Sequence, residues 1–172
     1  MNYAVVLAVM MLSLCCYRDV IAKPLRKGSG APPQPISPVL HSPDTYSAVR
    51  EVSRHAQNED MEVAVRLIPS PNIRGDHQKV CCLHANILGY YLHSILPLRH
   101  NMHNQMPQLR EDLARVARDL STHGCVIDEY DDHESSVAFK NELKKMGDKG
   151  INKAIGEVDI LFTYLTDFCV LA

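Results

Sequence analysis

Cysteine and histidine offer this chain its widest range of chemistry, and it contains six cysteines and nine histidines. Both side chains bind zinc, and a cysteine thiolate is also a nucleophile. A zinc site usually shows a short repeat such as C-x-x-C, and a hydrolytic zinc helix shows H-E-x-x-H; the sequence has neither. His100 and His103 are one helical turn apart, and His84 and His93 share one segment, but solvated imidazoles explain these spacings more simply. We therefore predict no metal site and no reactive thiol.

Other motifs that support catalysis or ion binding are also missing. The acidic run Asp128–Glu134 lacks the alternating oxygen ligands and the glycine of a calcium-binding loop, so it is interpreted as a solvated loop. The sequence contains no G-x-S-x-G nucleophile motif, no glycine-rich phosphate loop and no nucleotide-binding fingerprint. These absences predict a protein that is not an enzyme and needs no cofactor.

Residues 1–22 have the pattern of a secretory signal peptide. The apolar run Ala4–Leu14 is too short to span a bilayer, and Val20 and Ala22 suit the positions three and one before a cleavage point. Cleavage after Ala22 would leave a secreted, extracellular chain that starts at Lys23. Its 150 residues suit one domain with a substantial core.

The charge of the chain limits its partners. The formal net charge is −2, and removal of the signal peptide would leave it unchanged. A weakly acidic protein is a poor match for nucleic acid or an anionic membrane surface. No second apolar run of membrane length follows the signal peptide, so membrane insertion is not expected either.

Four cysteines would remain after cleavage: Cys81, Cys82, Cys125 and Cys169. An even number of cysteines in a secreted chain predicts disulfides, here two. A bond between the neighbours Cys81 and Cys82 would close a strained ring, so each of these two should reach a distant partner. Two of the three connectivities stay open on this argument.

The order of elements predicts a helical domain behind a leader. Six prolines between Lys23 and Pro43 prevent a helix, so residues 23–43 are predicted to be a flexible leader. Residues 44–172 show helical periodicity and no sustained strand alternation. The expected helices run from Asp44 as N-cap to about Gln57, from Asp76 to Leu96, from about Pro107 to Gly124, from about Ser135 to Gly147, and from Ile151 to Cys169. Together they predict an all-α bundle of five or six helices.

The last of these segments has two apolar stripes. One stripe suits a core: Ile151, Ile155, Val158, Phe162, Leu165 and Cys169. The other lies on the opposite side of the helical wheel and mixes charged and apolar residues: Lys153, Glu157, Ile160 and Tyr164. Charges spaced i, i+4 beside an aromatic residue are typical of a binding surface. The alternative is that Ile160 and Tyr164 cover a neighbouring helix.

The same segment resembles a known family. The run KAIGEVDILF, Lys153–Phe162, is similar to the closing helix of the interleukin-10 family of secreted cytokines, the class II helical cytokines. Weaker similarity to that family continues in order through Val65–Ile68, Cys81–Leu96 and Leu113–Thr122. The resemblance implies a six-helix cytokine bundle stapled by two disulfides. The family pattern favours Cys81 with Cys169, which leaves Cys82 for Cys125.

The resemblance also implies a mechanism and its partners. A secreted cytokine of this family bridges one specific and one shared class II cytokine receptor chain, and so triggers JAK/STAT signalling, here expected in epithelial cells. A soluble binding protein is a further partner class that the family allows.

Individual receptor contacts are carried over by position. For the specific chain, they fall on Arg66, Lys153, Gly156 and Glu157, to which the second stripe adds Ile160 and Tyr164. For the shared chain, they fall on Tyr46 and Arg50. Three positions depart from the family pattern: Ala64 replaces an acidic residue, and Gln105 and Gln108 replace a tyrosine and a glutamate.

Other interpretations stay open at this stage. The adjacent pair Cys81 and Cys82 is a feature of the interleukin-20 branch, so an interleukin-20-like or interleukin-26-like ligand is an alternative. A secreted helical carrier of an apolar ligand is a less favoured one. The sequence is compatible with both a monomer and an intertwined dimer.

Overall fold

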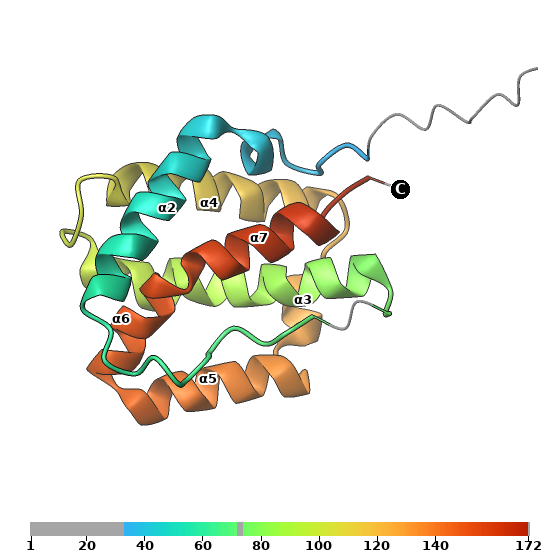
Figure 1. Ribbon diagram of the computed structural model, residues 1–172. Coiled ribbons are helices and arrows are strands. Elements are labelled where there is room, and N and C mark those ends of the chain that lie inside the picture. The colour runs from blue at the N-terminus through green and yellow to red at the C-terminus, as the bar shows by residue number, and fades with distance from the viewer. Residues whose placement is uncertain (1–32, 72–73, 172) are drawn as a thin grey trace, which may run out of the picture. The chain divides into compact units, whose positions relative to one another are not determined.

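A computed structural model describes residues 33–71 and 74–171. Within these ranges the chain forms six α-helices and no strand beyond one isolated bridge between Pro35 and Val170, which confirms the predicted all-α bundle. The helices are α2 (Pro43–Asn58), α3 (His77–Tyr90), α4 (Met106–Thr122), α5 (Glu134–Met146), α6 (Asp148–Gly156) and α7 (Val158–Phe168) (Figure 1). Short helical turns complete the fold: η1 (Pro38–His41), η2 (Tyr91–Ile95), η3 (Leu96–Arg99) and η4 (Ile127–Tyr130).

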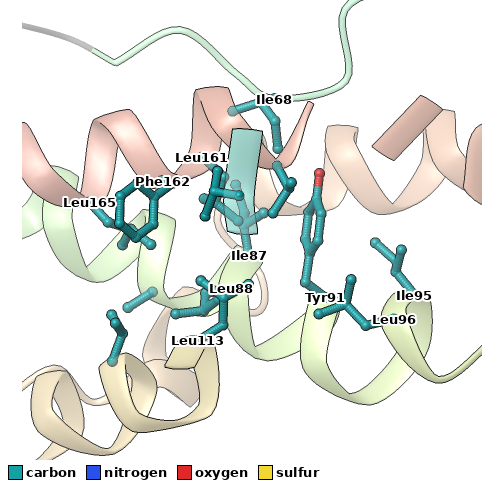
Figure 2. Close-up of a cluster of buried hydrophobic side chains, with 14 of the residues drawn as sticks. Ile68, Ile87, Leu88, Tyr91, Ile95, Leu96, Leu113, Leu161, Phe162 and Leu165 are labelled. Carbon is teal, nitrogen blue, oxygen red and sulfur yellow. The ribbon is translucent and has the colours of Figure 1, made fainter. Parts of the chain in front are cut away.

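The core lies around α3, which contacts α4, α5 and α7. Figure 2 shows side chains of α3 and η2 meeting those of α4 and α7 at its centre, among them Leu88, Leu113 and Leu161, which are fully buried. The segment predicted as a helix from Asp76 to Leu96 thus supplies the centre of the core. Among the described residues, every fully buried side-chain nitrogen or oxygen has a hydrogen-bond partner. No helix in the described part of the chain is both long and apolar enough to cross a membrane.

The first helix starts differently from its prediction. Ser42, not Asp44, is the N-cap of α2, and its hydroxyl accepts the backbone N–H of Thr45 at 3.4 Å. Pro43 follows at the first helical position, where a proline loses no helical hydrogen bond. Asp44 lies in the first turn, where its negative charge interacts favourably with the helix dipole. At the start of α3, the predicted boundary residue Asp76 is the cap.

The predicted helix from Ile151 to Cys169 is in fact two helices, which meet at Glu157. The break has two side-chain causes. The hydroxyl of Tyr91 donates to the carbonyl of Ala154 at 2.7 Å, and the side-chain amide of Gln57 donates to the carbonyl of Gly156 at 2.6 Å. In a continuous helix each carbonyl would accept the N–H four residues further on, whereas here the Ala154 carbonyl accepts the nearer N–H of Glu157 at 3.0 Å. The two side-chain bonds therefore favour the break. This split raises the number of α-helices in the described residues to six, from the five whose bounds the sequence predicts. The apolar run Val63–Ile68 forms no helix.

The second half of the expected leader is not flexible. Residues 33–43 pack on the bundle, with Val39 and Leu40 of η1 buried. Backbone bonds tie this segment to the C-terminal end: Ile36 donates to Cys169 at 2.9 Å, and Leu171 donates to Gln34 at 2.7 Å. The buried apolar pair explains why a proline-rich segment can be ordered. The predicted signal peptide and the first part of the predicted leader lie outside the described residues.

Both expected disulfides are present. Cys81 bonds Cys169, which joins the second turn of α3 to the end of α7. Cys82 bonds Cys125, which joins the same turn to the residues after α4. They close loops with sequence separations of 88 and 43, and on the loop-entropy model each contributes roughly 4 kcal/mol of stability.

Candidate functional site

At the centre of the candidate site, Glu157 at the junction of α6 and α7 accepts two backbone hydrogen bonds. Its carboxylate accepts the backbone N–H groups of Leu67 at 2.9 Å and Ile68 at 2.8 Å. These two residues belong to the connection between α2 and α3, which has no regular structure of its own over residues 60–71. Charge-assisted bonds to a carboxylate are stronger than neutral ones. Glu157 therefore fixes the connection against the last two helices.

Lys153 fixes the same connection at an earlier point. Its ammonium group lies 2.8 Å from a carboxylate oxygen of Asp60 and 3.6 Å from Glu157. Burial tends to raise the pKa of Asp60, but hydrogen bonds from Lys153 and from the backbone N–H of Glu62, together with the charge of Lys153, outweigh it and lower that pKa below its ordinary value. A buried lysine between two carboxylates is a paired arrangement whose disruption is costly.

These contacts correct one expectation from the sequence. Lys153 and Glu157 were expected on an exposed binding stripe, yet they are only 7% and 6% exposed. The connection from α2 to α3 covers the stripe and uses its two charges as internal partners. Ile160 and Tyr164, from the same stripe, are partly buried.

Arg66 and Tyr164 form the exposed end of this arrangement. The Arg66 guanidinium donates to the Tyr164 hydroxyl and, through Nε, to the Ile68 carbonyl at 3.1 Å. Beneath them lies the fully buried ring of His84, with its centroid 5.0 Å from that of Tyr164. Burial lowers the pKa of His84, and hydrogen bonds to the backbone only partly oppose this.

Between the α2–α3 connection and helices α6 and α7 lies a surface groove of about 350 Å³, which we call the Asp60 groove. Five of the sequence-predicted residues line it: Arg66, Lys153, Gly156, Glu157 and Ile160. The backbone at Gly156 lies close to α2, because a Cβ there would lie 3.3 Å from Cγ of Gln57, which is tighter than most such contacts. The polar wall and the apolar side chains of Val63, Val65 and Ile160 suit a mixed protein surface.

Four lining residues were missed from the sequence: Gln57, Asp60, Val63 and Val65. Asp60 stands in a polar stretch, and Val63 and Val65 stand in a short apolar run without helical periodicity, so no pattern marked them. For Gln57 the only available signal was its place at the predicted end of the first helix, which says nothing of a contact with Gly156, 99 residues away.

The two remaining predicted residues lie elsewhere. Tyr46 and Arg50 are one turn apart on α2, both exposed, and neither lines the Asp60 groove. Tyr46 is 59% exposed, which is high for an aromatic side chain. Next to it, Thr45 donates to the buried Asp112 of α4 at 2.7 Å, and Gln108 donates to the same carboxylate at 3.0 Å. The chain thus presents a second candidate surface where α2 and α4 pack together.

Known proteins match both the sequence and the bundle. The family model described as "Interleukin 22 IL-10-related T-cell-derived-inducible factor" matches residues 42–169. Human interleukin-22 is 32% identical over 130 residues, which cover 73% of this chain and 69% of that protein. Mouse interleukin-22b is 30% identical over 128 residues, with the same coverage of both chains.

A solved structure agrees with the sequence matches. The crystal structure of zebrafish interleukin-22 superposes with a TM-score of 0.65 at 28% identity, and the match covers 77% of this chain and 96% of that one. The relatives of this chain are interleukins, which are cytokines and not enzymes. The resemblance to the interleukin-10 family is thereby confirmed and narrowed, and this chain belongs to the interleukin-22 family of cytokines.

Proposed function

We propose that this chain is a secreted cytokine that bridges a specific and a shared class II cytokine receptor chain on epithelial cells. Bridging brings the kinases bound to the two receptor chains together and starts JAK/STAT signalling. Family membership supports this function over an apolar-ligand carrier, and the match to the interleukin-22 family model supports it over an interleukin-20-like or interleukin-26-like ligand. The two separate candidate surfaces, the Asp60 groove and the exposed residues of α2, are what a bridging ligand needs.

The specific receptor chain binds the Asp60 groove in this proposal. The main support for this assignment is the Glu157 carboxylate. It holds the connection from α2 to α3 through hydrogen bonds from two backbone N–H groups, at 2.8 and 2.9 Å. A connection held in this way presents Arg66 and Val63 in fixed positions before the partner arrives. Preorganisation of this kind reduces the entropy lost on binding. Lys153 and Glu157 then act as positioning residues, with Arg66, Ile160 and Tyr164 as the contacts.

Receptor affinity tests this assignment. Arg66→Ala should lower the affinity for the specific receptor ectodomain at least tenfold, measured by surface plasmon resonance, with little change in circular dichroism. Arg115→Ala is a matched control, because Arg115 is an exposed arginine on α4 whose ion pair with Glu111 is on the surface. Equal affinities of the two variants and the unaltered protein would remove the groove as the binding site.

The shared receptor chain binds the exposed surface of α2 around Tyr46 and Arg50. Tyr46→Ala should retain affinity for the specific chain but weaken STAT phosphorylation in cells that express both chains. A panel of cells, each expressing one pair of class II receptor chains, identifies the pair that responds. No STAT response from any pair would refute the proposed function.

A further inference from the structure

A second hollow lies next to the Asp60 groove. It has a volume of about 780 Å³ and is called here the Leu98 hollow. Its walls come from four parts of the chain: the end of α2, the segment Glu59–Glu62, the residues Leu98–Met102, and the start of α6. None of the residues predicted from the sequence to bind a receptor lines it.

The hollow is bordered by apolar side chains that the fold leaves in water. Met61 is 86% exposed and Leu98 is 62% exposed, although both belong to the walls of the same hollow, together with the partly buried Met102. Single exposed apolar residues are ordinary on a protein surface, but several around one concavity mark an interaction site. Methionine is also well suited to such a surface, because its flexible side chain adapts to a partner.

The hollow and the Asp60 groove are continuous across one short segment. Asp60 lines both of them, Met61 lines the hollow, and Val63, 83% exposed, lines the groove. A partner seated in the groove therefore meets the segment Asp60–Val63 as a ridge, with the hollow directly on its other side.

The ridge is held in place at both ends. Asp60 bonds Lys153 of α6 at 2.8 Å and accepts the backbone N–H of Glu62 at 2.9 Å. Glu62 pairs with Lys149 of α6 at 3.2 Å, and its carbonyl accepts the N–H of Val65 at 3.0 Å. Met61 and Val63 are thus presented by a fixed backbone rather than by a loose loop.

The charge of the hollow favours a basic partner. Four carboxylates line it, from Glu59, Asp60, Glu62 and Asp148, against two cations, Arg99 and Lys149. Asp60 and Glu62 are already paired with lysines, whereas Glu59 and Asp148 are exposed at the edge. A partner that places a lysine or arginine there gains complementary charge, which mainly accelerates association.

We propose that the specific receptor chain crosses this ridge and continues into the Leu98 hollow. An apolar receptor side chain contacts Met61 and Leu98, and a basic one faces Glu59. This extension rests on the proposed function, because it assigns the hollow to the same receptor chain that binds the Asp60 groove. It predicts one continuous footprint in place of two separate sites.

The test uses the full secreted chain with the double substitution Met61→Ser and Leu98→Ser. Both side chains are largely exposed, so the fold should be unaffected. Affinity for the specific receptor ectodomain should fall about tenfold, mostly through faster dissociation. Val137→Ser is the control, because Val137 is an exposed apolar residue of α5 that lines neither concavity. In addition, Glu59→Lys should slow association, and more so at low salt.

The outcomes separate this inference from the function on which it rests. If Arg66→Ala weakens binding but the double variant and Glu59→Lys bind normally, the groove is the site and the extension is wrong. If the double variant loses affinity only for the shared chain, the extension is also wrong. If the unaltered protein binds no class II receptor chain, both proposals fail.

Discussion

The carboxylate of Glu157 lies 2.8 Å from the backbone nitrogen of Ile68, 89 positions earlier in the chain. This bond, with its neighbour to Leu67, joins the connection after α2 to the junction of α6 and α7. Its removal should therefore affect the connection more than the rest of the bundle, and the first prediction follows from that.

Glu157→Ala should lower the free energy of unfolding by about 3–5 kcal/mol, because it leaves the two backbone N–H groups of Leu67 and Ile68 without their acceptor and removes one of the two carboxylates that face Lys153. Glu157→Gln should cost less, since an amide oxygen can still accept a hydrogen bond. Urea denaturation measures the loss, and amide exchange at Leu67 and Ile68 should rise in both variants. Glu142→Ala, at an exposed ion pair, is the control with an expected effect below about 1 kcal/mol. Slow exchange at Leu67 in Glu157→Ala would contradict the clamp.

Tyr91→Phe should reduce stability by about 1–3 kcal/mol, because it removes the hydroxyl that bonds the buried Ala154 carbonyl. Part of that loss is recovered if the junction of α6 and α7 straightens, so that the carbonyl accepts the N–H of Val158 as in a continuous helix. Thermal unfolding gives the size of the effect, and a crystal structure of the variant shows the junction. Tyr90→Phe is the companion substitution, on a half-buried ring of the same helix. Equal melting temperatures for the two variants would show that the Tyr91 hydroxyl contributes nothing.

The paired substitution of Cys82 and Cys125 by alanine should cost roughly 4 kcal/mol, since it frees a loop of 43 residues in the unfolded chain. Peptide mapping of the unaltered protein should recover Cys81 linked to Cys169. A map that linked Cys81 to Cys125 instead would contradict the structure, in which these two sulfurs approach to 3.9 Å without a bond.

Acid should destabilise the protein in a window set by His84. Burial lowers its pKa in the folded state below the value of about 6.5 in an unfolded chain, so the unfolded state binds more protons between those two values. Stability contributed by the neutral ring is present above the unfolded value and declines as the pH falls through 6.5 toward the lowered pKa. Urea midpoints between pH 8 and pH 4.5 measure this slope, which His84→Gln should flatten. An unchanged slope in that variant would assign the pH dependence to other groups.

Asp60 should act in a separate and more acidic window. Its pKa is lowered in the folded state, so the stability from its bond to Lys153 is present above the ordinary pKa of an aspartate, about 3.9, and is lost below it. Asp60→Asn should remove this loss, and the two variants together distinguish the groups. Midpoints of Asp60→Asn that still fall as steeply below pH 4 would exclude Asp60 as the cause.

The positions of most helices could be predicted from the sequence, because each helix is marked by the local spacing of its apolar residues. Val158, Phe162 and Leu165 repeat at helical spacing in α7, and each is buried as expected. The disulfide pairing followed from the family resemblance, whereas the residues alone excluded only a bond between neighbours. Local pattern was thus sufficient for the bundle.

The candidate site was predicted only in part, because its contacts join distant positions. Lys153 and Glu157 line the groove but were wrongly expected in solvent, since a helical wheel does not show that residues 60–68 cover them. The junction at Glu157 depends on Tyr91 and Gln57, which no local pattern connects to it. The sequence thus indicated several of the residues that line the groove, but it did not indicate which distant residues they contact.

The neighbouring positions of Cys81 and Cys82 have a mechanical consequence. Covalent links gather at the pole where α3 starts and where α4 and α7 end, whereas the opposite pole, at the end of α2 and the start of α6, is held by noncovalent bonds alone among the described residues (Figure 1). Breathing motions of the bundle should therefore concentrate at the uncrosslinked pole. The rigidity of the Asp60 groove at that pole therefore depends on the noncovalent bonds of Asp60, Glu62 and Glu157.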